Sequence, residues 1–172
     1  MELDYFTAVD DLQKDDETGS AMIGVTAFNS ACFYRYARID WNLLVKNLGG
    51  DKELARKTVE GFLRAAALAI PSGKQNSFAA QNPPDFMLGV VRTDGQSWSL
   101  ANAFEAPVKP GREGGLMAAS IQKLDAYWAK LNKAYGNDGM TTAALSLDVP
   151  PANLVPEENM NAWVQKLLGA LE

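Results

Sequence analysis

The sequence predicts an α+β fold, and three observations lead to this prediction. Segments with helical periodicity alternate with short segments rich in aromatic and β-branched residues, so both kinds of element are expected along one chain. Of the 172 residues, 47% are apolar and 22% are charged, which is the composition of a soluble globular domain. A chain of this length buries roughly two thirds of its unfolded surface and can form a core without disulfides.

Three segments have apolar residues spaced by three and four positions, which predicts helices. They cover residues 52–70, 116–135 and 157–171. Asp51 is expected to cap the first helix and Pro71 to end it. Gly136 is expected to end the second helix, and Pro156 to lie in the first turn of the third. The apolar stripes, including a tryptophan on each of the last two helices, predict packing in the core.

Strands are predicted between the helices. Residues 31–39 combine aromatic and β-branched side chains, residues 86–92 form a buried apolar run, and residues 143–147 form a third strand segment. The dipeptide at residues 94–95, Asp-Gly, is typical of a hairpin turn. It predicts that residues 97–100 return as a strand.

The composition excludes several classes of site. The chain has no histidine, so Ser-His-Asp and Cys-His nucleophile systems cannot form, and the single cysteine, Cys32, has no disulfide partner within the chain. The start has no signal-peptide pattern, and the longest apolar run, residues 65–70, is too short to cross a membrane. We therefore expect a cytoplasmic protein with no membrane partner.

The net charge of −5 is unevenly distributed. Residues 1–34 carry −6, residues 35–112 carry +4 and residues 113–172 carry −3. Because binding to a phosphate backbone depends on clustered Lys and Arg, the middle segment is where a nucleic acid would lie. The carboxylates at residues 10–17 lack the spacing of a calcium loop, so a solvated loop is expected there and no metal is assigned.

Two loops contain residues suited to phosphate binding. Residues 73–77 lack the upstream glycine of a Walker A loop and have Gln75 where that loop needs Ser or Thr, so a polar loop with one cation remains. Residues 109–115 place Lys109 and Arg112 among glycines that permit close backbone approach. From the residues alone, each loop is either a binding loop or a plain connector.

One predicted strand carries an aromatic and basic face. Tyr34, Tyr36 and Arg38 alternate along it and share one side, as in RNA-binding sheets. The segment does not match the pattern of an RNA-recognition motif, and half-buried tyrosines are ordinary in strands, so packing is the alternative.

Five segments, taken together, carry a resemblance to a known family. They are Asp4–Leu12, Phe28–Ala37, Leu48–Gly50, Gly73–Ala80 followed by Asn82-Pro83, and Ser99–Glu105. In order and spacing these segments resemble the CasC family, the repeated backbone subunit of the Cascade surveillance complex of type I-E CRISPR systems. The resemblance covers about the C-terminal half of that family.

The resemblance implies a fold and a function. Members are built on an RRM-like (ferredoxin-like) palm with a helical domain and a protruding thumb. Residues 1–30 are therefore expected to form a thumb hairpin, and residues 31–172 the C-terminal part of the palm with C-terminal helices. Members polymerise along CRISPR guide RNA, hold its backbone, displace bases with the thumb and have no catalytic activity. The implied partners are guide RNA, neighbouring copies of the subunit, other Cascade subunits and, through the guide, the target DNA strand; no cofactor is implied.

The resemblance also implies site residues. By position, Tyr5, Phe6 and Thr7 resemble the thumb tip that wedges beside a displaced base. The implied contacts to the RNA backbone are Lys74, Gln75, Asn76, Lys109 and Arg112.

Two other interpretations stay open. The first is a protein-interaction fragment that associates with itself or complements a missing N-terminal half without binding RNA, because a sheet divided between two halves leaves an unpaired strand edge. The second and more distant one is a nuclease that binds a metal through Asp10 and Asp15.

Overall fold

A computed structural model describes most of the chain. The described residues are 2–8, 22–70, 72–73, 79–111, 115–147 and 150–171. The chain divides into two compact units, of which the first combines residues 1–32 with 73–80 and the second combines residues 33–72 with 81–172.

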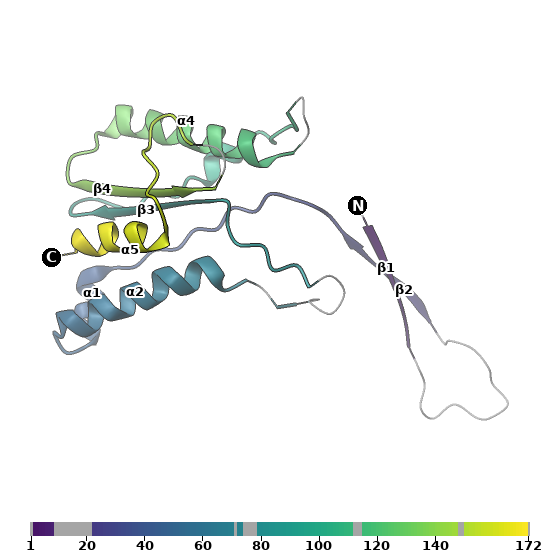
Figure 1. The fold of residues 1–172 in the computed structure, drawn as a ribbon, viewed down its shortest axis with the longest axis horizontal. Helices are drawn as coiled ribbons and strands as arrows, with labels where there is room; N and C mark the ends of the chain where they lie inside the picture. Colours follow the sequence, from purple (N-terminus) through teal and green to yellow (C-terminus); the bar gives the residue numbers. More distant parts are fainter. Residues whose placement is uncertain are drawn as a thin grey trace. The chain divides into compact units, whose positions relative to one another are not determined.

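The first unit contains an antiparallel hairpin (Figure 1). Strand β1, Glu2–Thr7, pairs with strand β2, Ile23–Phe28, and Tyr5 lies opposite Val25 in the register. An N-terminal hairpin is the element that the CasC resemblance implies for this part of the chain.

The second unit is built around two antiparallel strands. Strand β3, Phe86–Arg92, pairs with strand β4, Met140–Ser146, so that Gly89 lies opposite Ala143. Because strand side chains alternate between faces, the sheet contacts different elements on its two sides. Figure 1 shows helix α4, Met117–Tyr135, on one side, and helix α5, Met160–Gly169, with helix α2, Lys52–Leu68, on the other.

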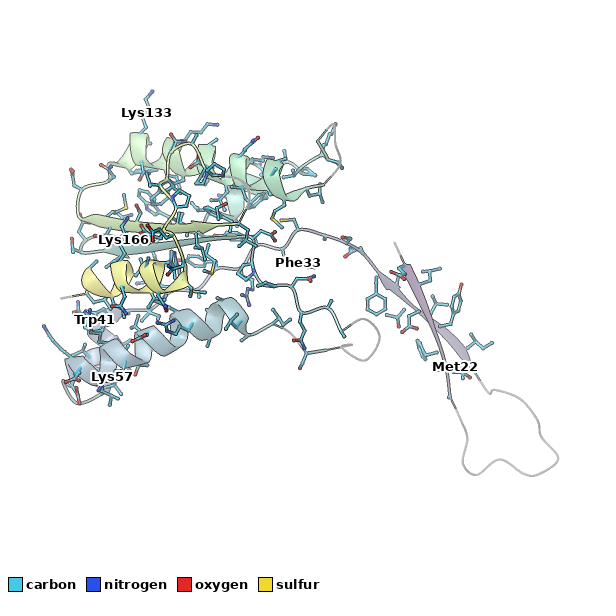
Figure 2. All side chains as sticks on the ribbon, in the orientation of Figure 1. Met22, Phe33, Trp41, Lys57, Lys133 and Lys166 are labelled. Atoms are coloured by element: carbon cyan, nitrogen blue, oxygen red, sulfur yellow. The ribbon has the colours of Figure 1, made fainter. Side chains whose placement is uncertain are left out.

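Each face of the sheet has its own hydrophobic core, and side chains fill the space on both sides of it (Figure 2). On the α5 side, Val164 and Leu168 are fully buried beside Ala143. On the α4 side, Trp128, which is 4% exposed, packs with Leu100 and Ala144. The mixed α+β architecture predicted from the sequence is therefore confirmed.

The three predicted helices are present with shorter limits. Asp51 accepts a hydrogen bond from the Leu54 amide at 2.9 Å and caps α2, as predicted. Gly136 ends α4 with a φ of 79°, a conformation that favours glycine. Helix α5 begins only at Met160 and is capped by Asn159.

Pro156 is not in the first turn of α5, and that prediction was wrong. It forms an isolated parallel bridge with Ala144, and the next amide, from Glu157, donates to the Ala144 carbonyl at 2.8 Å. A tertiary contact with β4 therefore holds this proline in extended backbone.

The strand predicted at residues 31–39 is absent from the structure. Residues 29–40 contain no helix and no strand. Side chains position this segment instead. Arg35 donates to the carbonyls of Ala66 and Ala69 at the end of α2. The Tyr34 hydroxyl accepts from the Leu100 amide at 2.8 Å. Strand propensity is not sufficient here because a strand needs a backbone partner.

The strand predicted at residues 97–100 is also absent. The Asp-Gly pair does bend the chain, and Gly95 has a φ of +68°. However, β3 pairs with β4, which is distant in sequence, and residues 97–100 lead into a short 3-10 helix, Ala101–Phe104.

A short helix was missed by the sequence analysis. Helix α1, Trp41–Asn47, is capped by Asp40, which accepts from the Leu43 amide at 3.0 Å. Trp41 and Leu44 pack against the core on the α5 side. Apolar residues at spacings of three and four after an aspartate carried this signal in the sequence.

One buried carboxylate fixes the connection to α5. Asp125 of α4 is 3% exposed and accepts hydrogen bonds from the amides of Ala152 and Asn153 and from the Asn153 side chain.

Within the described part of the chain, no helix is long and apolar enough to cross a membrane.

Candidate nucleic-acid interface

The hairpin presents aromatic side chains on both of its faces. Tyr5 pairs with Val25 and the next residue, Phe6, pairs with Gly24, so the two rings point to opposite sides. Tyr5 is 66% exposed and Phe6 is 45% exposed. Two rings on opposite faces can contact two different bases or surfaces, but they cannot stack on the same side of one base.

The face that carries Tyr5 is apolar except for Thr7, which lies opposite Ile23 at its end. Leu3, Ile23 and Val25 share that face with Tyr5, and all of them are exposed. A two-stranded hairpin with such a face is marginally stable alone in water. The face is therefore suited to contact another molecule.

The opposite face is shaped by one glycine. A Cβ atom at Gly24 would lie 2.7 and 2.8 Å from the Phe6 ring carbons Cε2 and Cε1, so any larger residue here would displace the ring from this position. On the Tyr5 face, Thr7, the third residue of the predicted wedge, donates from Oγ1 to the Met22 carbonyl at 2.8 Å. Its hydroxyl thus supports the end of the hairpin.

Several cations of the basic middle segment bind within the chain. Arg56 donates to the Leu168 carbonyl at 2.6 Å, and Arg64 pairs with Glu60 at 2.9 Å. Lys57 pairs with Glu53 at 3.0 Å. These cations are therefore engaged within the chain and are not free to contact phosphates.

Four cations of the middle segment make no hydrogen bond or ion pair with any residue that the structure describes. These are Arg38, Lys46, Lys52 and Lys109. Lys109 is exposed, in agreement with a role in a surface loop. Lys74, Gln75, Asn76 and Arg112 lie outside the described residues, so the structure does not place them together with Lys109.

Arg38 is an additional phosphate-binding candidate. It is exposed in the extended segment that precedes α1, whereas the tyrosines grouped with it are engaged within the chain. The Tyr34 ring contacts Phe104 with 5.8 Å between centroids, and the Tyr36 hydroxyl donates to Ser97 Oγ at 3.1 Å. Packing thus accounts for the two aromatic residues, and the basic residue remains available.

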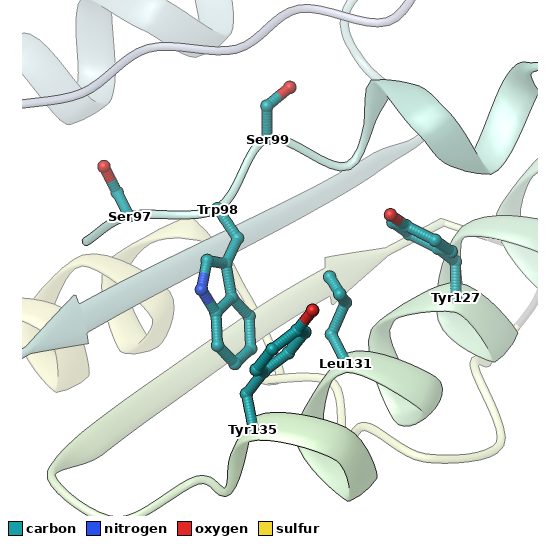
Figure 3. A pocket seen from close by; sticks show the side chains of 6 residues that line it. All are labelled: Ser97, Trp98, Ser99, Tyr127, Leu131 and Tyr135. Atoms are coloured by element: carbon teal, nitrogen blue, oxygen red, sulfur yellow. The ribbon is translucent and has the colours of Figure 1, made fainter. Parts of the chain in front are cut away.

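An open pocket of about 350 Å³ lies beside α4 in the second unit (Figure 3). Its lining consists of Ser97, Trp98, Ser99, Tyr127, Leu131 and Tyr135. The centroid of the Trp98 ring lies 5.8 Å from that of Trp128 and 5.9 Å from that of Tyr135. The Cζ atom of the Arg92 guanidinium lies 4.3 Å from the Trp98 ring centroid. These contacts anchor the segment after β3 onto α4.

A metal centre is not supported by the described residues, which contain no group of three or more carboxylate or cysteine side chains that could hold an ion. Asp10 and Asp15, the pair considered for a nuclease, lie outside them.

Comparison with known proteins identifies the family. The family model described as CT1975-like protein matches residues 1–168. The chain belongs to the CT1975-like family.

Solved structures of CRISPR complexes contain chains similar to this CT1975-like chain over nearly its whole length. A chain of a "CRISPR RNA-guided surveillance complex" is 33% identical with a TM-score of 0.82, and the match covers 98% of this chain and 64% of that one. A chain of a "CRISPR RNA-guided surveillance complex, pre-nicking" is also 33% identical, with a TM-score of 0.80 and coverage of 99% and 46%. The CT1975-like chain therefore spans less than two thirds of these relatives. No curated protein gave a significant match.

Proposed function

We propose that this CT1975-like chain is a non-catalytic, guide-RNA-binding part of a CRISPR surveillance complex, acting in the cytoplasm and equivalent to the C-terminal half of the CasC backbone subunit of type I-E Cascade. The observation that carries the proposal is similarity to chains of RNA-guided surveillance complexes over 98% of its length at 33% identity. The exposed aromatic rings of the hairpin and the free cations of the second unit support it.

In this proposal the hairpin acts as the thumb. The Tyr5 ring stacks on a base, and the exposed apolar face around it excludes water from the stack. Phe6 contacts a neighbouring group from the opposite face. Thr7 holds the end of the hairpin through its bond to the Met22 carbonyl and keeps the two rings in position.

The proposed phosphate contacts come from residues of both units, and those of the second unit belong to an RRM-like palm. Lys109 and Arg38 are exposed and free of partners among the described residues, and Lys74 and Arg112 are proposed to act with them. Gln75 and Asn76 donate hydrogen bonds to phosphate or sugar oxygens. Neighbouring copies and other Cascade subunits bind along the same guide, and the target DNA strand contacts the complex by pairing with it.

The test is the salt dependence of RNA binding. Four phosphate contacts predict a loss of affinity of about 50-fold between ~50 and ~200 mM salt for single-stranded RNA, measured by fluorescence anisotropy with a labelled oligonucleotide. Lys109→Ala and Arg38→Ala are each expected to lower the salt slope by about 0.7. Lys133→Ala removes the same charge from an exposed site in the acidic third of the chain and serves as the control (Figure 2). Affinity that is independent of salt contradicts the proposal.

Stacking is tested separately. Tyr5→Ala is expected to weaken binding by about 1–3 kcal/mol, or roughly 5- to 150-fold, because one base loses its aromatic platform. Tyr5→Phe keeps the ring and is expected to bind like the unmodified chain. Equal RNA affinities for the unmodified chain and both variants would show that Tyr5 does not contact RNA.

The absence of catalysis is tested by incubating RNA with the chain and Mg²⁺. RNA recovered intact is the expected result for a non-catalytic subunit.

A second candidate function is protein interaction without RNA binding. The observation that favours it is the exposed apolar face of Leu3, Tyr5, Ile23 and Val25, which a partner protein can cover as well as a base can. Sedimentation of the purified chain distinguishes the two. Self-association that Ile23→Lys abolishes supports the second candidate, whereas a monomer that binds RNA supports the first.

A further inference from the structure

The open pocket beside α4 presents two tyrosines at a fixed spacing. Tyr127, Leu131 and Tyr135 follow one another at intervals of four residues, so they share one face of the helix. At a rise of 1.5 Å per residue, the two tyrosines are about 12 Å apart along the helix axis. Figure 3 shows Leu131 between them and the Trp98 ring beside Tyr135. The pocket therefore offers two separate aromatic surfaces.

Polar groups of the pocket are still available to a ligand. The hydroxyls of Tyr127 and Tyr135 bond to no residue that the structure describes. On the opposite wall, Ser97 Oγ accepts from the Tyr36 hydroxyl at 3.1 Å and keeps its own O–H as a donor. Donors beside aromatic rings suit an extended polypeptide, because its carbonyl groups have no internal partners.

The charges around the pocket favour a peptide over a nucleic acid. The Arg92 guanidinium covers the Trp98 ring and is largely buried, whereas the side chain of Asp94, 4.0 Å from it, is 69% exposed. This end of the pocket therefore presents a carboxylate, which repels phosphate groups. At the other end, Lys130 follows Tyr127 by about one helical turn, is exposed and pairs with no described residue.

The same chain contains an exposed proline segment of comparable dimensions. Residues 107–110, Pro-Val-Lys-Pro, precede α4, contain no helix or strand, and expose both prolines. Each proline fixes its own φ and favours extended backbone in the residue before it. In a polyproline II conformation, with three residues per turn and a rise of 3.1 Å, the two prolines share one side about 9 Å apart. Aromatic grooves recognise Pro-x-x-Pro segments of this kind.

Both ends of the proline segment are anchored within its own chain. Lys123 of α4 donates to the Ala106 carbonyl, and the Gly111 amide donates to the Gly115 carbonyl at 3.3 Å. Neither proline lines the pocket of its own chain. The pocket that the segment can enter is therefore that of another copy, and the anchoring reduces the entropy lost on binding.

We propose that the proline segment of one copy of this chain binds the aromatic pocket of a second copy. Pro107 lies against Tyr127, and Pro110 lies against Tyr135. Val108 and Lys109 then face away from the pocket, because only every third residue of the segment points toward it. Lys109 thus stays available for the phosphate contact proposed above.

Charge sets the direction in which the segment binds. The exposed Glu105 precedes the two prolines in the sequence. The proposed direction brings Glu105 toward Lys130, whereas the opposite direction would bring it toward Asp94. Because the segment and the pocket are different surfaces, each copy can bind one neighbour through each of them.

This contact goes beyond the proposed RNA binding, because it requires neither RNA nor the hairpin. It is tested by sedimentation of the full chain without RNA, so its failure and the failure of RNA binding are separate results. The unmodified chain is expected to associate increasingly as its concentration rises.

Two variants, each lacking one of the two surfaces, test the contact. Tyr135→Ala removes a ring of the pocket from a residue that is 73% exposed, and Pro107→Ala combined with Pro110→Ala removes the segment's rings. Each variant alone is expected to associate at least about tenfold more weakly than the unmodified chain. When mixed, they are expected to form a one-to-one complex, because one retains the segment and the other retains the pocket.

Three control variants are expected to associate within about twofold of the unmodified chain. Tyr135→Phe keeps the ring, Val108→Thr changes a side chain that faces away from the pocket, and Ile23→Lys changes the hairpin. Circular dichroism checks that every variant is folded. A chain that stays monomeric, association that Ile23→Lys abolishes, or a mixture of variants that forms no complex overturns the proposal. Loss of RNA affinity in Tyr135→Ala without any self-association would assign the pocket to nucleic acid and also overturn it.

Discussion

The contact between Gly89 and Leu167 gives a quantitative test of the packing between β3 and α5. A Cβ atom at Gly89 would lie 2.9 Å from Leu167 Cδ2 and 3.1 Å from Cγ, and nearer still to Cδ1. Leu167 is 4% exposed and belongs to the core on the α5 side, so it has little freedom to move away. Gly89→Ala therefore introduces overpacking at the centre of the sheet.

The expected net loss of stability is about 0.5–2 kcal/mol. Overpacking of a core costs about 1–3 kcal/mol, and the lower backbone entropy of alanine in the unfolded chain returns about 0.5–1 kcal/mol. Gly61→Ala is the matched control, because no atom lies within 4 Å of a Cβ built at this exposed position of α2. It is expected to stabilise the chain by about 0.5–1 kcal/mol.

The assay is urea denaturation followed by circular dichroism, with a double-mutant cycle. Leu167→Val shortens the side chain, so that no Cδ atom lies beside residue 89. The lost methylene lowers the free energy of unfolding by about 1 kcal/mol. In that background Gly89→Ala is expected to be neutral or stabilising, which gives a coupling energy above about 1 kcal/mol. A Gly89→Ala variant as stable as the unmodified chain, or strictly additive effects, would refute the packing argument.

Three further predictions concern single side chains. Asp125→Ala is expected to lower the free energy of unfolding by about 2–4 kcal/mol in urea titrations, because it leaves the donors of residues 152–153 without their buried acceptor. Asn159→Ala is expected to lower the free energy of unfolding by about 1 kcal/mol through loss of the α5 cap. The slope of that free energy against urea concentration, the m-value, is expected to stay the same. Arg92→Met is expected to cost less than about 1 kcal/mol in thermal melts, because the lost contact with Trp98 is offset by removing a buried guanidinium nitrogen, Nη1, that has no partner among the described residues.

The candidate site was only partly accessible to sequence reasoning. The resemblance placed Tyr5 and Phe6 together at one tip, yet the hairpin register separates their rings onto opposite faces. The pattern Tyr34, Tyr36 and Arg38 was visible, but only the tertiary contacts show that both tyrosines are used for packing and that Arg38 is left over. The assignments of Lys74, Gln75, Asn76 and Arg112 remain predictions.

The sequence by itself determined the elements whose backbone hydrogen bonds join residues close to one another in the chain. Helices α2 and α4 begin and end close to the predicted residues, because a helix closes its hydrogen bonds within four residues and its caps lie beside it. The apolar run of β3 was also recognised, because six uncharged residues, five of them apolar, precede Arg92.

The tertiary structure alone decided which extended segments became strands. Residues 31–39 have strand propensity but no backbone partner in the described structure, whereas β3 found β4 across many intervening residues. It also decided that Pro156 would bridge to β4. The physical reason is that a strand completes its hydrogen bonds only with another segment, and the sequence of one segment does not specify where that partner lies.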